Sequence, residues 1–177
     1  MDEGRQRGLF SQLRDQVVAR LEADDYLGEA PRIKVIGKDL TTISAQLQEH
    51  LTKAVGENGA GICVIAATPR VSSVDGNKIL TVSVTVTVSE NIVLNNGQKG
   101  SQKPSEDVSL FVFLRLLRWA PEGWGQLTAI KGASAIQLMS MGPDKENGIQ
   151  TRVEYGVTLY TQTQLQFSED TDGDENE

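Results

Sequence analysis

The sequence is poor in the residues that most catalytic and metal sites require. Its 177 residues include one cysteine, Cys63, and one histidine, His50. One of each cannot supply the three or four protein ligands of a zinc site without carboxylate help, and a lone cysteine cannot form an internal disulfide. Cys63 lies in an apolar run that disfavours a thiolate, and His50 lies on the polar side of a predicted helix. We therefore expect no catalytic residues, no metal, no cofactor and no enzymatic activity.

Long apolar runs and an excess of basic charge are also missing. The longest apolar stretch, Val108 to Leu117, is interrupted by Arg115 and is far shorter than the roughly 20 residues that span a bilayer. Met1 to Arg7 carries charges of both signs without an apolar stretch behind it, so we expect a cytosolic protein that does not enter membranes. The net charge is −7, but Ser168 to Glu177 holds six acidic side chains and no basic ones. The remaining body is nearly neutral, which argues against specific nucleic-acid binding.

Hydrophobic periodicity predicts one α+β domain over residues 1–167 and an acidic, disordered tail over 168–177. The strongest signal is a strand from Lys78 toward Leu94, in which apolar and hydroxyl side chains alternate. The fold class expected is a mainly antiparallel sheet with helices packed on one face. Helices are predicted over Leu9–Ala23, from Asp39 or Thr41 to Val55, and over Val108–Trp119. Strands are predicted over Arg32–Ile36, Gly61–Ala67, before the turn Asp75-Gly76-Asn77, over Lys78–Leu94, over the extended segment Gln126–Met139, and over Ile149–Phe167, with a loop at Met141–Gly148.

The two longest predicted strands are too long for the body that carries them. Ile149 to Phe167 would reach roughly 60 Å when extended, whereas a body of this size has a diameter on the order of 40 Å. Either both strands bend, at Gly156 and at Ser89-Glu90-Asn91, or their ends leave the domain and meet neighbouring subunits. Apolar residues near these ends, with exposed lysines and the two tryptophans, are the candidate subunit or tube contacts: Val88, Ile92, Leu94, Lys99, Lys103, Trp119, Trp124, Leu165 and Phe167.

Four segments in this order resemble a known family. They are the Val/Thr strand Ile79–Val88, the Gly- and Lys-containing loop Asn95–Ser105, the helix Val108–Trp119 ending in Ala120-Pro121-Glu122-Gly123-Trp124, and the last strand with Val153-Glu154-Tyr155-Gly156-Val157. Together they resemble the tail-terminator and minor tail proteins of long-tailed bacteriophages, in particular the Mu-like group.

The resemblance implies a virion protein of the phage tail, assembled in the host cytoplasm. Such a subunit forms a ring, commonly a homohexamer, that caps the finished tail tube, stops its polymerisation and offers a surface for the head. The implied partners are copies of the chain itself, the tail tube protein and the head-tail connector proteins. Two alternatives stay open: a tube or neck (head-tail joining) subunit, and a small-molecule enzyme that uses Glu154 with Tyr155 or Tyr160 in a sheet-lined pocket.

Overall fold

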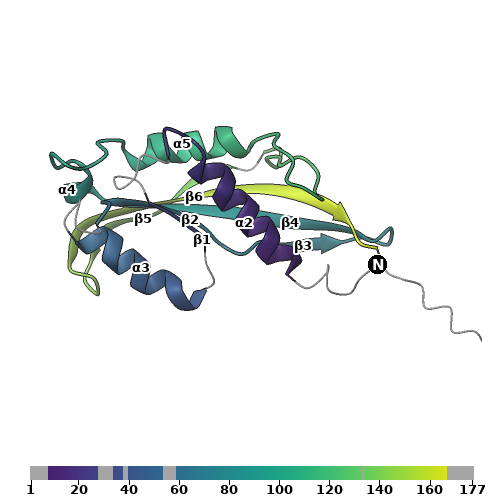
Figure 1. Cartoon of the computed structure of the whole chain (residues 1–177), viewed down its shortest axis with the longest axis horizontal. Coiled ribbons are helices and arrows are strands. Elements are labelled where there is room, and N and C mark those ends of the chain that lie inside the picture. The colour runs from purple at the N-terminus through teal and green to yellow at the C-terminus, as the bar shows by residue number, and fades with distance from the viewer. Residues whose placement is uncertain (1–7, 28–33, 38–39, 54–58, 133, 167–177) are drawn as a thin grey trace, which may run out of the picture.

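The computed structural model describes residues 8–27, 34–37, 40–53, 59–132 and 134–166. Within these ranges the chain forms one six-stranded sheet with helices packed against it (Figure 1). No helix in the described part is long and apolar enough to cross a membrane. In chain order the elements are α2 (Leu9–Glu22), β1 (Lys34–Gly37), α3 (Leu40–Thr52), β2 (Ile62–Ala66), β3 (Arg70–Val74), β4 (Ile79–Asn91), α4 (Ile92–Asn95), α5 (Ser105–Leu116), β5 (Ile136–Asp144) and β6 (Ile149–Gln164).

The sheet is mainly antiparallel, which confirms the predicted α+β class. Its strand order is β1-β2-β4-β6-β5, and β3 pairs with β4 on the same edge as β2. Only β1 and β2 run parallel among the described pairs. The centre is the β4–β6 ladder, which runs without a register shift from Ile79 opposite Gln164 to Asn91 opposite Arg152.

The main core lies between this ladder and two helices. The even-numbered residues of β4 from Leu80 to Val88 point to one face and are almost completely buried, whereas the hydroxyl side chains between them point to the other face. The apolar stripes of α2 and α5 cover the buried face, which we call the helix face. These stripes consist of Leu13, Val17 and Leu21 from α2 and Val108, Val112 and Leu116 from α5.

Helix α3 packs on the opposite face of the sheet, so the prediction that all helices share one face is wrong. The reason lies in β2, whose five residues are all buried. Ile62 and Val64 join the main core, while Cys63 and Ile65 form a second cluster with Leu51 of α3. A strand that is apolar on both faces needs cover on both.

The predicted strand Lys78–Leu94 is shorter than expected, because β4 ends at Asn91. Asn91 is the N-cap of α4, and its side-chain oxygen accepts a hydrogen bond from the backbone N–H of Leu94. Ile92 and Leu94 therefore lie on a short helix. The first half of the segment predicted as a loop at Met141–Gly148 instead belongs to β5, which pairs with β6 as far as Asp144, and the second half forms the turn.

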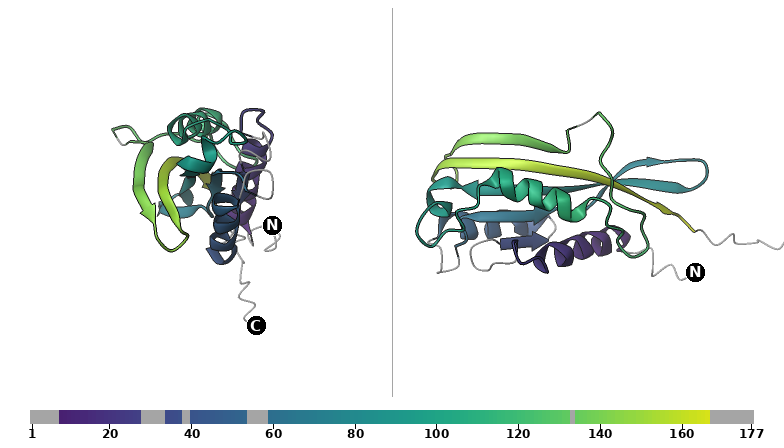
Figure 2. Two further views of the ribbon diagram at one scale, coloured as in Figure 1. Left: turned by 90° about the vertical axis from the view of Figure 1, so that its left-hand side faces the viewer. Right: turned by 90° about the horizontal axis from the view of Figure 1, so that it is seen from above.

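Neither long strand has the hinge that a bent-strand arrangement requires. The β4–β6 register continues through Gly156 and through Ser89 to Asn91 without a shift. Instead, the turn that joins β3 to β4 and the end of β6 extend beyond the helices (Figure 2), whereas Leu80 and Val82 of β4 are still buried in the main core. The ends of the ladder thus extend beyond the helices, and their contact with neighbouring subunits stays a prediction.

Candidate assembly surfaces

The first surface is a hairpin that extends beyond the helices. We call it the hairpin arm, and it comprises β3, the turn at residues 75–78 and β4 as far as Ser83. The Asp75 carboxylate stabilises the turn by accepting hydrogen bonds from the backbone N–H groups of Asn77, at 2.9 Å, and Ile79, at 3.0 Å. Lys78 adopts a φ of 61°, the left-handed conformation that such a turn uses.

The hairpin arm exposes two valines on the helix face. Val71 lies opposite Val82 and Val74 lies opposite Leu80, so both point to the face that α2 and α5 cover elsewhere. Leu80 and Val82 belong to the main core, but Val71 and Val74 lie outside it, and their side chains are 55% and 56% exposed. A bulge between Val71 and Ser73 puts both valines on one face although they are three residues apart.

The second surface is β5, the last strand at the other margin of the sheet. Its inner edge pairs with β6, and among the described residues no strand pairs with its outer edge. It exposes three large apolar side chains: Leu138 (50%), Met139 (62%) and Met141 (73%). Edge strands usually carry charges that prevent pairing with another chain, and Ile136 to Gly142 carries none.

A bulge also shapes the β5 edge. Leu138 lies opposite Tyr155 and Ser140 lies opposite Glu154, which leaves Met139 as the extra residue. Leu138 and Met141 consequently both point to the helix face, three residues apart. The sulfur of Met139 lies over Gly156, where a Cβ would stand 3.3 Å from it, so the glycine leaves room for the bulge.

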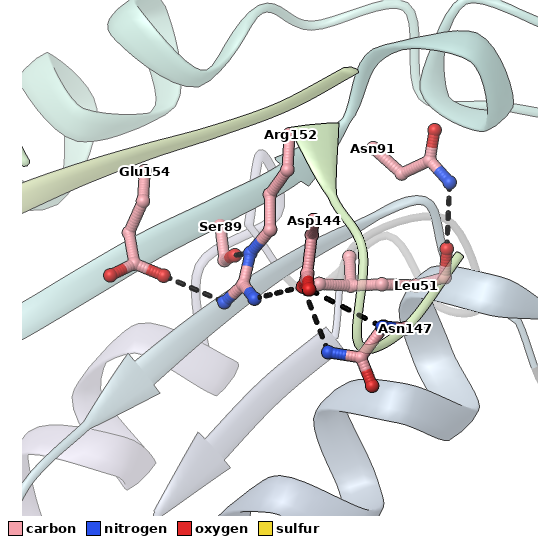
Figure 3. A network of polar contacts seen from close by, with 7 residues as sticks. All are labelled: Leu51, Ser89, Asn91, Asp144, Asn147, Arg152 and Glu154. Atoms are coloured by element: carbon pink, nitrogen blue, oxygen red, sulfur yellow. Dashed lines mark hydrogen bonds and ion pairs between the residues drawn. The ribbon is translucent and has the colours of Figure 1, made fainter. Parts of the chain in front are cut away.

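A polar network holds the β5–β6 hairpin on the face opposite the main core (Figure 3). The Arg152 guanidinium donates to Ser89 at 3.0 Å, to the Asp144 carboxylate at 2.7 Å and to the Glu154 carboxylate at 2.8 Å. The Asn147 amide also donates to Asp144, at 2.8 Å, which ties the turn to the strand. The network contains two carboxylates and one guanidinium, so it carries one net negative charge.

These contacts stabilise the charged form of Asp144. The hydrogen bond from the Asn147 side chain, followed by that from Arg152, holds the pKa of Asp144 below its ordinary value. A hollow of about 470 Å³ opens beside the network and is lined by residues 140–146 and Arg152. The described residues contain no cluster of three His, Cys, Asp or Glu side chains arranged to hold a metal ion.

A third apolar surface lies on α5, where Leu110 and Leu114 are about half exposed. The first turn of the same helix is joined to β6, because the Tyr155 hydroxyl donates a 3.0 Å hydrogen bond to the Glu106 carboxylate. Partial desolvation, followed by the hydrogen bond to Glu106 and the negative charge of that carboxylate, raises the pKa of Tyr155. This contact places Tyr155 on the helix face, while its neighbour Glu154 faces Arg152 on the other side.

The structure does not bring together the residues named for the enzyme alternative. Glu154 and Tyr155 point to opposite faces of β6, and Tyr160 lies six positions along the strand from Glu154. At about 3.3 Å per residue, Glu154 and Tyr160 are separated by roughly 20 Å. None of these pairs converges on one pocket.

Two of the predicted contact residues are buried inside the chain itself. Val88 has no exposed surface, because it lies between Val64 and Tyr155 under α5, so the prediction that it needs cover from a neighbour is wrong. Trp124 is 8% exposed and belongs to the main core, where it serves as a lid.

The other predicted contact residues occupy varied positions. Lys103 binds within its own chain, with its ammonium 3.1 Å from the Tyr26 carbonyl oxygen and above the Tyr26 ring. Trp119 is partly buried, and the Arg20 guanidinium lies over its ring. Of the other predicted contact residues, Lys99 is exposed, and Ile92 and Leu94 are partly buried. Leu165 is partly buried against the main core, and Phe167 lies outside the described residues.

The exposed apolar residues at Val71, Val74, Leu138, Met139 and Met141 were missing from the predicted contacts. A sequence signal exists for Leu138, Met139 and Met141, which stand in a stretch without charges. No protein-family model matches the chain, and a comparison with curated proteins finds no match. The fold and these surfaces define an α+β domain in which, among the described residues, no strand pairs with the outer edge of β3 or of β5.

Proposed function

We propose that this chain is a non-enzymatic structural subunit that assembles with its own copies into a ring, and that the ring caps the tail tube of a long-tailed bacteriophage. In this role the ring stops polymerisation of the tube and presents the joining surface for the head. The tube and head assignment comes from the family resemblance of the sequence. The proposal that copies of the chain assemble is supported by the exposed apolar residues at the two margins of the sheet.

The observation that carries the assembly proposal is the open sheet with apolar residues at both margins. Val71 and Val74 on one side, and Leu138, Met139 and Met141 on the other, are each at least half exposed. Exposed apolar edge strands are aggregation-prone in a monomer, whereas pairing with another copy covers them. The two margins differ, so pairing between them is head-to-tail, and head-to-tail contacts generate rings when the rotation closes.

Two measurements test assembly and capping separately. Native mass spectrometry with negative-stain microscopy of the purified chain should show a closed ring, for which six copies is the expected number. A chain that stays monomeric over a wide concentration range, with and without the tube protein, would overturn the proposal.

Capping is tested by adding the chain to polymerising tube protein and measuring tube lengths. A terminator should shorten the tubes as its concentration rises, because each ring blocks one growing end. A tube or neck-joining subunit is the competing role, and it would co-polymerise or bind the head connector without changing the length distribution.

A further inference from the structure

We infer that the hairpin arm of one copy pairs with the β5 edge of the next copy, in antiparallel register, with Val74 opposite Leu138 and Val71 opposite Met141. The inference rests on the proposed ring, and it names the strands that join the subunits. The occupant of the β5 edge is thus β3 of a second copy of this chain.

The first support is strand direction. β3 and β6 both run antiparallel to β4, and β5 runs antiparallel to β6, so β3 and β5 have opposite directions within one copy. A second copy that continues the sheet in the same orientation therefore meets β5 with an antiparallel β3. The helix face of both copies then stays on one side of the joined sheet.

The second support is the spacing of the apolar residues. Val71 and Val74 point to the helix face with two residues between them, and so do Leu138 and Met141. Each pair owes this spacing to a bulge, since strict alternation would put residues three apart on opposite faces. Each strand carries one extra residue, so the two strands can pair over these four positions without another register shift. Four apolar side chains, each at least half exposed, then cover one another.

The third support is which edges remain open. On the margin opposite β5, the outer edges of β3 and of β1 have no strand partner among the described residues, and β3 is the one of the two whose exposed apolar residues match those of β5. The inner edge of β3 is occupied by β4, which leaves its outer backbone groups directed away from the domain.

The fourth support is charge. In this register Arg70 of the second copy lies opposite Gly142, diagonal to Asp144. Arg70 is exposed and pairs with Ser83, so it points to the same face as the network of Arg152, Asp144 and Glu154. Within the described residues Arg70 forms no ion pair, and the network carries one surplus negative charge. Diagonal neighbours across strands lie within reach of a long side chain.

The register also sets the step between copies. Leu138 pairs with Tyr155 of β6, which in turn pairs with Val88 of β4. Val74 pairs with Leu80 of β4, so Leu138 and Val74 lie eight positions apart along β4. At about 3.3 Å per residue this is roughly 26 Å along the strands, and four strands per copy at about 4.8 Å give roughly 19 Å across them. In a closed ring with this step the strands are steeply inclined to the ring axis.

Cysteine crosslinking of the full-length chain tests the pairing. Leu138→Cys and Val74→Cys are prepared as separate variants, mixed and oxidised, and read out on a non-reducing gel. The mixture should give at least about tenfold more covalent dimer than either variant alone, because a paired edge holds the two thiols at high effective concentration. The native Cys63 is completely buried, and the unsubstituted chain controls for its reaction.

The matched control replaces Val74→Cys by Val93→Cys. Val93 is a 65% exposed valine on α4 and takes no part in the inferred β3–β5 pairing, so its mixture with Leu138→Cys should give no more dimer than the single variants. All three substituted residues are at least half exposed, and circular dichroism checks that each variant keeps its fold.

The outcomes separate this inference from the proposed function. Strong dimer formation by Leu138→Cys alone would show that β5 pairs with itself and would overturn the inference. Rings by native mass spectrometry without a Leu138–Val74 crosslink would also overturn it, while the ring proposal would stand. Monomers under all conditions would overturn both.

Discussion

Replacing Glu90 should destabilise the chain more than any surface substitution, because this carboxylate is buried and joins three elements. It is 4% exposed at the end of β4. One oxygen accepts a 2.7 Å hydrogen bond from the Asn95 amide, and the other accepts a 3.0 Å bond from the backbone N–H of Ser105, the first residue of α5. Glu90 thus supplies the cap that Pro104, the N-cap residue, cannot provide with its side chain.

The magnitude follows from counting these bonds. A hydrogen bond to a charged group contributes about 1.5 to 3 kcal/mol, and a buried donor left without a partner adds its desolvation cost within that range. Glu90→Ala removes the acceptor from two buried donors and should lower the free energy of unfolding by about 4 kcal/mol. Glu90→Gln retains one acceptor oxygen but turns an NH₂ toward the second donor. This variant should therefore lower the free energy of unfolding by about 2 kcal/mol.

Urea unfolding followed by circular dichroism at fixed protein concentration measures both values, since association would otherwise shift the midpoint. Glu22→Ala, at an exposed position of α2, is the control and should change the free energy by less than about 0.5 kcal/mol. A Glu90→Ala variant within about 1 kcal/mol of the unsubstituted chain would refute the role of Glu90 as the cap of α5.

Three further predictions concern the loop, the polar network and the core. Gly100→Ala should lower stability by about 3 kcal/mol in the same urea assay, because the new Cβ would stand 2.0 Å from the Asn95 carbonyl oxygen; an unchanged midpoint would contradict this close approach. Hydrogen bonds from its amide and guanidinium partners lower the folded-state pKa of Asp144, so its stabilisation is present above the ordinary aspartate range and is lost as the pH falls through the lowered value. Asp144→Asn should therefore reduce the loss of stability between neutral and acidic pH, measured by urea midpoints along a pH series, and an identical acid profile would count against the network. Leu116→Ala, in the core, should cost about 3 kcal/mol by thermal or urea unfolding, whereas Leu114→Ala, 56% exposed on the same helix, should cost less than about 1 kcal/mol; equal losses would show that α5 packs by another face.

The elements with a strong period could be predicted from the sequence, because a single face of each is buried. The strict alternation of β4 identified the central strand, and the helical spacing of Leu13, Val17 and Leu21 identified α2. The excess length of the two long strands left two arrangements open, a bend or an extension beyond the helices, and in the structure the hairpin turn and the end of β6 extend.

The remaining features depend on tertiary contacts that leave no period. The run Ile62–Ala66 is apolar at every position and therefore does not indicate which face meets which helix, so the place of α3 could not be predicted. β5 contains Gly142 and Pro143, residues typical of loops, and becomes a strand because β6 offers it a partner. Val88 was expected to be exposed at the end of a long strand. In the structure α5, a helix that comes later in the chain, covers it, and the alternation of β4 alone does not reveal this contact.

The two unlike margins of the sheet have a consequence for polarity. In the proposed ring, copies joined margin to margin would all point the same way, so its two rims would have different chemistry. One rim would gather the tips of the hairpin arms, with Asp75 and Lys78, and the opposite rim would gather the β5–β6 turns. An annulus with two unlike rims can bind one structure below it and a different one above it without any change in its subunits.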